Sequence, residues 1–315
     1  MEFPREKYVT KLMDSRGNGL IKVITGIRRV GKSYLMNELF CRRLLDSGVD
    51  EKDIIRFAFD SDEDLDALDE LLPEEPTRLK QKRITLINSK KFRKYLSGRL
   101  EGKNRVYILL DEVQLLEGFA GTLNGLLRHK GYDIYVTGSN SRFLSSDIAT
   151  EFRGRGQAIH VLPLTFSEYM SQQDRSPDVC WMDYIETGGI PVVACMGSRE
   201  ERMSYLKVLC DGTYLNDIVS RHGVRNGSAL SDVFDIVAST ISSLVNPTRI
   251  ADTFGTVLGK DITDDTVGEY IGYFEDAFMI SRCLRYDVKG RKYIGTPFKL
   301  YFEDIGIRNV RLNFR

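Results

Sequence analysis

The sequence contains few of the residues that build metal centres or disulfide-bonded scaffolds. It has three histidines and five cysteines in 315 residues, and no two cysteines are spaced as a C-x-x-C pair. This scarcity argues against a zinc site and a disulfide framework, and scattered reduced thiols are typical of a cytosolic protein. No apolar run is long enough to span a bilayer, and residues 1–13 lack the apolar segment of a secretory signal. We therefore expect a soluble, cytoplasmic protein with no membrane partner.

The net charge indicates no particular partner, because 45 basic residues balance 45 acidic ones. The charges are nevertheless unevenly distributed along the chain. Residues 60–75 contain acidic but no basic side chains. In residues 78–105, by contrast, every charged side chain is basic except that of Glu101. We expect both segments to be solvated and to attract each other. The alternative, a nucleic-acid-binding patch, is disfavoured because the basic segment contains only two aromatic residues, Phe92 and Tyr95.

Residues 20–36 carry the clearest functional signal. Residues 20–25 form a short apolar run rich in β-branched side chains, which predicts a buried strand. Residues 26–33, GIRRVGKS, match the phosphate-binding pattern G-x-x-x-x-G-K-[ST] at every fixed position, and apolar residues at helical spacing follow. A chance match in a glycine-rich loop is the alternative. It does not account for the order of strand, loop and helix, which the motif requires.

The motif assigns a role to several of these residues. Gly26 and Gly31 permit the tight turn that brings backbone N–H groups close to phosphate oxygens, and the positive end of the next helix faces the same anion. The Lys32 ammonium is expected to reach the β- and γ-phosphates, and the Ser33 hydroxyl to bind Mg²⁺. The sequence thus predicts ATP and Mg²⁺ as cofactors. The predicted nucleotide-binding residues are Gly26, Ile27, Arg28, Arg29, Val30, Gly31, Lys32, Ser33 and Tyr34.

An acidic pair follows the near-continuous apolar run at residues 106–110, which is typical of a central parallel strand. Asp111 is expected to hold Mg²⁺ through Ser33 or a water molecule. Glu112 is expected to orient and deprotonate the water that attacks the γ-phosphate. A strand end that is acidic by chance is the alternative, and the phosphate-binding motif about 80 residues earlier favours the catalytic interpretation.

Two further segments contain candidate residues on less specific grounds. The strand expected at residues 133–137 ends in polar residues beside the acidic pair, so Ser139 or Asn140 could hold the attacking water. Turn-forming residues without a catalytic role explain the same segment equally well. In the segment FRGRG, Arg155 is the preferred candidate for an arginine that contacts the γ-phosphate, in its own subunit or a neighbouring one. An ordinary surface arginine is the alternative.

Strands alternate with helices as far as residue 163, which predicts a three-layer α/β domain with a mostly parallel sheet. Residues 164–226 are expected to be mainly helical. From residue 227, three predicted helices precede an alternating stretch at 279–302 with a turn at 288–291, the element order of a winged helix-turn-helix. The predicted domains are therefore 1–163, 164–226 and 227–315. The excess of basic side chains after residue 281 suits contacts with a DNA backbone, and a joint between domains or subunits is the alternative.

Taken together, these motifs resemble a known family. GIRRVGKS, VYILLDEVQ, TGSNS, FRGRG, HVLPLTFSEYM, TGGIP and PFKLYFEDIGIRN form the series seen in prokaryotic AAA+ superfamily ATPases whose C-terminal part is a domain of unknown function. The resemblance implies a P-loop ATP-binding domain, a helical segment and a winged helix. Members of this family are similar to restriction-endonuclease-fold proteins in a further C-terminal segment. Because this chain ends at Arg315, before such a segment, we do not extend a nuclease role to it.

We therefore predict a Mg²⁺-dependent ATPase in which hydrolysis or nucleotide state moves the winged helix relative to the α/β domain. The alternative is a nucleotide-gated switch or DNA-binding module that binds ATP and hardly hydrolyses it. ATP is the expected partner, and DNA and further copies of the chain are candidate partners.

Overall fold

The computed structural model describes residues 1–81, 84–138, 152, 154–285 and 297–312, and its residues group into two compact units. The N-terminal unit comprises Pro4–Gly26 and Gly31–Val161. The C-terminal unit comprises Met1–Phe3, Ile27–Val30 and Leu162–Arg315. The four residues Ile27–Val30 therefore group with the C-terminal unit although they lie inside the phosphate-binding motif. The finer division into three domains stays a prediction.

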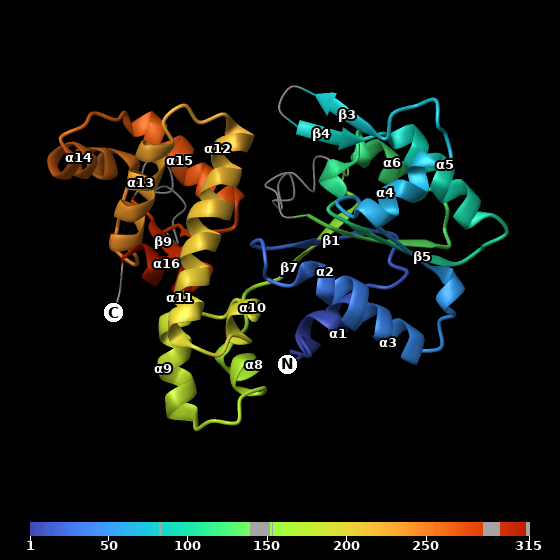
Figure 1. Ribbon diagram of the computed structural model, residues 1–315, viewed down its shortest axis with the longest axis horizontal. Coiled ribbons are helices and arrows are strands. Elements are labelled where there is room, and N and C mark those ends of the chain that lie inside the picture. The colour runs from blue at the N-terminus through green and yellow to red at the C-terminus, as the bar shows by residue number, and fades with distance from the viewer. Residues whose placement is uncertain (82–83, 139–151, 153, 286–296, 313–315) are drawn as a thin grey trace. The chain divides into compact units, whose positions relative to one another are not determined.

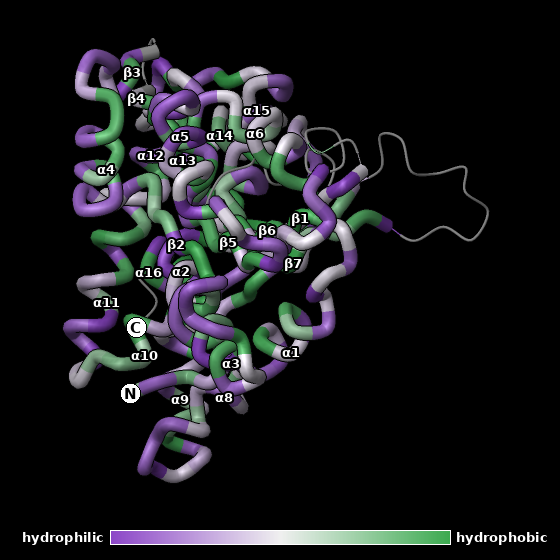
Figure 2. Tube along the Cα trace, turned by 90° about the vertical axis from the view of Figure 1, so that its right-hand side faces the viewer, coloured by the Kyte–Doolittle hydropathy of each residue, from purple (hydrophilic) through white to green (hydrophobic). Residues whose placement is uncertain are grey.

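A five-stranded parallel sheet forms the centre of the N-terminal unit (Figure 1). In spatial order its strands are β2 (Ile54–Ala58), β5 (Val106–Asp111), β6 (Tyr132–Thr137), β1 (Ile21–Thr25) and β7 (Gly156–His160). Every residue of β1 is buried, as expected of a central strand that is covered on both faces. In Figure 2, β5 is coloured mainly as hydrophobic, whereas a surface helix such as α4 alternates between hydrophilic and hydrophobic residues. The predicted α/β fold with a parallel sheet is confirmed.

Helices lie on both faces of this sheet (Figure 1). On one face are α1 (Glu6–Asp14), α2 (Lys32–Tyr34), the π-helix η1 (Leu35–Phe40) and α3 (Cys41–Asp46); on the other are α4 (Asp62–Asp69), α5 (Ser89–Leu100) and α6 (Phe119–Leu126). Two short 3₁₀ turns, Glu51–Asp53 and Val113–Leu115, complete the connections. A buried aromatic cluster, in which Phe57 contacts Phe59 and Phe92, joins the sheet to α5.

The acidic and basic segments contact each other, as the sequence predicts. Three ion pairs join them: Arg78 with Asp62, Lys90 with Glu75, and Lys91 with Asp69. Part of the basic segment forms an antiparallel hairpin of β3 (Arg78–Gln81) and β4 (Ile84–Ile87) that the sequence reasoning did not anticipate. This strand pair was missed because each strand has only four residues, which is too short for an alternating pattern to stand out.

The C-terminal unit is mainly helical. Its elements are α8 (Phe166–Met170), α9 (Pro177–Thr187), α10 (Pro191–Ala194), α11 (Arg199–Val208), the π-helix η5 (Leu209–Leu215), α12 (Asn216–His222), α13 (Gly227–Ser239), α14 (Pro247–Leu258), α15 (Asp264–Asp276), β8 (Ile280–Cys283), β9 (Lys299–Phe302) and α16 (Ile305–Arg311). Side-chain caps begin several of these helices. Thr165 and Glu168 form a capping box at α8, and Asn246 and Thr263 cap α14 and α15.

Three helices and an antiparallel strand pair follow residue 227 in the predicted order. After α13, α14 and α15, strand β8 pairs with β9, and a bridge joins Val245 to Phe298. The turn expected at residues 288–291 lies outside the described residues. The assignment of this region as a winged helix therefore stays a prediction. Within the part of the chain that the structure describes, no helix combines the length and hydrophobicity needed to cross a bilayer.

The final helix is joined to the α9–α10 connection by a buried carboxylate. Asp304 accepts hydrogen bonds from the backbone N–H groups of Gly189 (2.7 Å), Gly306 (2.9 Å) and Ile307 (3.3 Å). A Cβ atom added at Gly188 would lie 2.2 Å from the Asp304 carboxylate, so glycine is required there. The motifs TGGIP and DIGIRN thus form one structural joint in the C-terminal unit.

Candidate nucleotide-binding site

The phosphate-binding motif has the backbone conformation of an anion-binding loop. Strand β1 ends at Thr25 and α2 begins at Lys32, so the loop connects a strand to a helix. Gly26, Arg29 and Gly31 have positive φ angles of 140°, 70° and 92°. Left-handed residues in such a turn direct successive N–H groups to one side, which creates a concave site for an anion. The Arg29 conformation costs about 1 kcal/mol or more in a non-glycine residue and persists only if its surroundings enforce it.

Lys32 lies against the loop that it follows. Its side chain is buried, and its Nζ donates a hydrogen bond to the Gly26 carbonyl at 3.0 Å. The ammonium is therefore held across the loop at the end of β1. Ile27 and Val30 are also buried, so they anchor the loop, while the Tyr34 side chain is exposed.

Asp111 and Ser33 meet at the carboxyl ends of β5 and β1. Asp111 is buried, and its carboxylate accepts hydrogen bonds from the hydroxyls of Thr137 and Ser33. Burial raises the pKa of Asp111, although these two hydrogen bonds and the positive charge of Lys32 oppose the shift. The two residues predicted to bind magnesium are thus side by side. Metal binding itself stays a prediction.

The donor set at this point fits Mg²⁺ better than a transition metal. A carboxylate and a hydroxyl supply oxygen ligands, and Mg²⁺ in proteins is usually held by one or two such groups together with substrate phosphates and water. Among the described residues, no group of three or more histidine, cysteine, aspartate or glutamate side chains could hold a metal ion. The site is therefore suited to a cation that arrives with a phosphate ligand.

Thr137 organises both acidic residues, and sequence reasoning missed it. Its hydroxyl donates to Asp111, and it accepts a hydrogen bond from the Glu112 backbone N–H at 3.0 Å. Glu112 has a left-handed backbone, with φ of 51°, and its carboxylate accepts a hydrogen bond from the Gln114 amide. Strained backbone of this kind occurs often at functional sites. The available signal was that Thr137 ends the strand next to β5.

Three further candidate residues remain. Ser139 and Asn140 lie outside the described residues. Arg155 is exposed at the amino end of β7, where its carbonyl accepts a hydrogen bond from the Ile21 N–H at 2.8 Å. Ile21 begins β1, so Arg155 lies at the edge of the sheet opposite the phosphate-binding loop, about 13 Å away along the strand. A contact with its own site is therefore not supported, and a role at a neighbouring subunit stays a prediction.

Comparisons with known proteins agree with this architecture. A sequence model described as an AAA domain matches residues 18–170, and a model for a domain of unknown function, DUF8612, matches residues 180–315. An uncharacterized protein of Haemophilus influenzae is 30% identical over 310 residues, which cover 96% of this chain and 72% of that protein. The chain belongs to the AAA+ P-loop ATPase family. The predicted family, with its C-terminal domain of unknown function, is confirmed.

Other proteins are similar to this chain at lower identity. An uncharacterized protein of Methanocaldococcus jannaschii is 26% identical over 307 residues, which cover 93% of this chain and 62% of that protein. Among solved structures, the Aeropyrum pernix ORC1 protein in complex with DNA overlaps 98% of this chain and 92% of its own chain, at 13% identity and a TM-score of 0.37. A likeness at this TM-score carries no argument about activity or partners.

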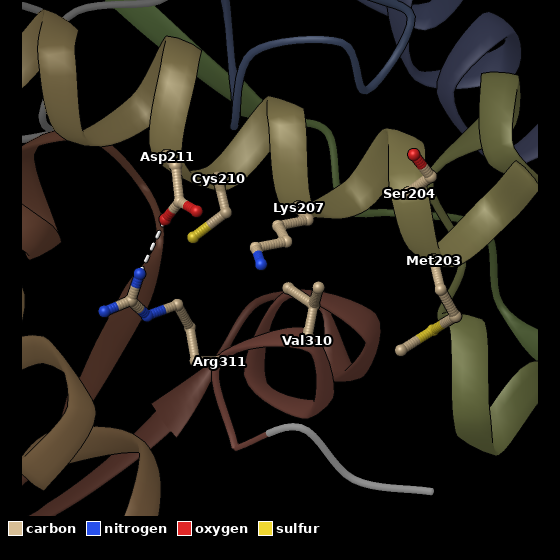
Figure 3. Close-up of a pocket in the computed structure, with 7 residues that line it drawn as sticks. All are labelled: Met203, Ser204, Lys207, Cys210, Asp211, Val310 and Arg311. Atoms are coloured by element: carbon tan, nitrogen blue, oxygen red, sulfur yellow. Dashed lines mark hydrogen bonds and ion pairs between the residues drawn. The ribbon is translucent and has the colours of Figure 1, made fainter. Parts of the chain in front are cut away.

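The C-terminal unit contains a pocket of its own. The pocket has a volume of about 530 Å³ and lies between α11, η5 and α16 (Figure 3). Arg311 and Asp211 form an ion pair of 2.6 Å at one end of it. Burial raises the pKa of the Cys210 thiol to about 12, so this cysteine is protonated and unreactive at neutral pH. The pocket is lined by Met203, Ser204, Lys207, Cys210, Asp211, Val310 and Arg311.

Proposed function

We propose that the protein binds ATP with Mg²⁺ at the phosphate-binding loop and hydrolyses it. The observation that carries this proposal is the meeting of Ser33 and Asp111 beside a loop with anion-binding backbone conformation. Chance strand ends and glycine turns would not bring a hydroxyl, a buried carboxylate and a buried ammonium to one edge of the sheet.

Each residue has a distinct task in the proposed reaction. The loop N–H groups hold phosphate oxygens, and Lys32 exchanges its bond with the Gly26 carbonyl for one with the terminal phosphate. Mg²⁺ held by Ser33 and Asp111 would neutralise phosphate charge. Glu112 accepts the proton of the attacking water. Thr137 holds the Asp111 carboxylate and the Glu112 backbone in place through its two hydrogen bonds.

The test is Glu112→Gln, which removes the base and keeps the shape. We expect phosphate release to fall at least about 100-fold while the dissociation constant for ATP stays within a few-fold of wild type. Glu117→Gln is the matched control, because Glu117 follows the same strand and its carboxylate accepts a hydrogen bond from the Ser89 hydroxyl. Full hydrolysis by Glu112→Gln would contradict the proposed base. Unchanged ATP affinity in Lys32→Ala would contradict nucleotide binding at this loop.

A nucleotide-gated switch with little turnover is the second candidate, and one contact favours it. The Gln114 amide donates a hydrogen bond to the Glu112 carboxylate and so occupies an oxygen that would otherwise accept the proton of the attacking water. Saturable ATP binding by the wild type with phosphate release at background would support the switch. An increase in phosphate release on Gln114→Leu would show that this contact restrains hydrolysis.

We also propose that residues 227–315 act as a winged helix that moves with nucleotide state and contacts DNA. The order of three helices and a strand pair supports the fold, but several basic side chains are already engaged within the protein. Arg282 pairs with Glu275 at 2.7 Å, and Arg311 pairs with Asp235 and Asp211. Anisotropy of labelled duplex DNA, measured with and without ATP at two salt concentrations, tests this role. A DNA affinity that changes with neither salt concentration nor ATP would contradict this role.

We also propose that the protein assembles into homo-oligomers. Arg155 is exposed and lies far from the phosphate-binding loop of its own chain, so it could act only at the site of a neighbouring subunit. Nucleotide-dependent mass measurements would test it, and a strictly monomeric protein with full activity would exclude a contribution of Arg155 to a neighbouring site.

A further inference from the structure

A tyrosine of the C-terminal unit contacts the backbone of the phosphate-binding motif. Tyr214 lies near the end of η5 and is only 3% exposed. Its hydroxyl donates a hydrogen bond of 2.8 Å to the carbonyl oxygen of Arg28. Both residues belong to the C-terminal unit, since Ile27–Val30 groups with it. Neither the motif nor the family match assigns a role to Tyr214.

This hydrogen bond fixes one peptide plane of the loop. In a trans peptide the carbonyl and the N–H point in opposite directions, so an anchored Arg28 carbonyl also fixes the direction of the Arg29 N–H. Arg29 is the residue with φ of 70°, a conformation that a non-glycine residue keeps only when its surroundings enforce it. Tyr214 is therefore placed to maintain the strained turn that gives the loop its anion-binding shape.

We propose that Tyr214 is a positioning residue for the phosphate-binding loop, so that nucleotide affinity depends on the packing of η5. This inference rests on the proposed nucleotide binding at that loop and adds to it. The ligand concerned is a nucleoside di- or triphosphate, because the loop N–H groups hold phosphates rather than the base.

The environment of Tyr214 supports a permanent rather than an occasional contact. Burial raises the pKa of the Tyr214 hydroxyl well above its ordinary value, so it remains a donor at physiological pH. The same helix is fastened by Asp211, which pairs with Arg311 of α16 (Figure 3). The π-helical conformation of η5 is uncommon and is frequent at functional sites.

A second contact to the same loop residue is weaker. Asp217 pairs with the Arg28 guanidinium at 2.5 Å, and both side chains are substantially exposed. Exposed ion pairs contribute little, so we expect the buried hydroxyl to dominate.

Tyr214→Phe in the full chain tests the inference, because it removes the hydroxyl and keeps the ring. We expect the dissociation constants for ATP and ADP, measured by calorimetric titration, to rise about tenfold each, the effect of leaving one partly buried carbonyl without its donor. Tyr184→Phe is the matched control. Its hydroxyl donates a similar hydrogen bond, 2.7 Å long, to the Leu164 carbonyl in the same unit. Both variants should lower the melting temperature without nucleotide, but Tyr184→Phe should leave nucleotide affinity unchanged.

The outcomes separate this inference from the proposed function. If wild type binds ATP, Lys32→Ala loses it and Tyr214→Phe binds like wild type, the positioning role is wrong and nucleotide binding stands. Equal losses of affinity in Tyr214→Phe and Tyr184→Phe would show a general effect of stability and would also overturn it. Failure of wild type to bind ATP and ADP would overturn both proposals.

Discussion

The two ends of the parallel sheet each contain a buried lysine and a buried aspartate, but they are arranged differently. At the amino end, Lys22 pairs directly with Asp133 and also donates to the Leu20 carbonyl at 3.1 Å. Asp133 further accepts hydrogen bonds from the Gly17 N–H (3.0 Å) and the Tyr135 hydroxyl (2.9 Å). The charges there neutralise one another, and the groups around them complete a closed network.

At the carboxyl end, the lysine and the aspartate each form hydrogen bonds with neutral groups. Lys32 bonds to a loop carbonyl, and Asp111 receives hydroxyl groups that Mg²⁺ and phosphate could join or replace. Burial and electrostatics alone do not distinguish the ends, since burial shifts the pKa of Lys22 downwards and of Asp111 upwards. The difference lies in how the groups are paired. We therefore expect the amino-end pair to contribute to stability and the carboxyl-end residues to contribute to nucleotide binding and hydrolysis.

The largest expected effect concerns Asp111→Asn. Asparagine keeps the shape and can still accept a hydrogen bond, but it loses the charge that would hold Mg²⁺. We expect phosphate release to fall at least about 100-fold. The free energy of unfolding without nucleotide should change by less than about 1 kcal/mol. Asp111 forms no ion pair among the described residues, so its replacement leaves no buried cation without its partner. Steady-state phosphate release and urea unfolding measure the two quantities. A large loss of stability with retained turnover would reverse the roles assigned to the two ends.

The converse is expected at the amino end. Asp133→Asn leaves the Lys22 ammonium buried without its counter-charge, which costs about 3 kcal/mol of unfolding free energy. Urea unfolding checks the loss, and the affinity of the folded protein for ATP should stay within about twofold of wild type. The double variant Lys22→Met with Asp133→Asn should recover much of the stability, because it removes the stranded charge. If the double variant is as unstable as the single one, the pair does not act as a coupled unit.

Sequence patterns predicted what depends on neighbours in the chain. The apolar run at residues 106–110, for example, predicted the strand β5. Thr137 and Tyr214 were missed for a common reason. Each acts on a residue far along the chain, Asp111 or Arg28, and no local periodicity encodes such a contact. The position of Arg155 was also not predictable, because its glycine-rich surroundings suggest a turn while Gly156 in fact starts a strand paired with Ile21.

The smallest expected effect concerns a third buried carboxylate, Asp304 in the C-terminal unit, which accepts its hydrogen bonds from backbone N–H groups. Burial raises its pKa to about 6, although hydrogen bonds from backbone N–H groups oppose the shift. Tyr184 and Tyr214 interact with it electrostatically, and both have raised pKa values, so they stay neutral over the relevant pH range.

Because the folded state binds this proton more tightly than the unfolded state does, its contribution to stability is present at low pH and is lost as pH rises through about 6. Relative to Asp304→Asn, which lacks the titration, wild type should lose roughly 1 kcal/mol of unfolding free energy between about pH 5 and 7.5. Urea unfolding of both proteins at the two pH values measures this difference. A difference of the opposite sign would mean that the backbone hydrogen bonds outweigh burial, and Asp304 would then resemble the satisfied amino-end pair rather than a carboxylate that is costly to ionise.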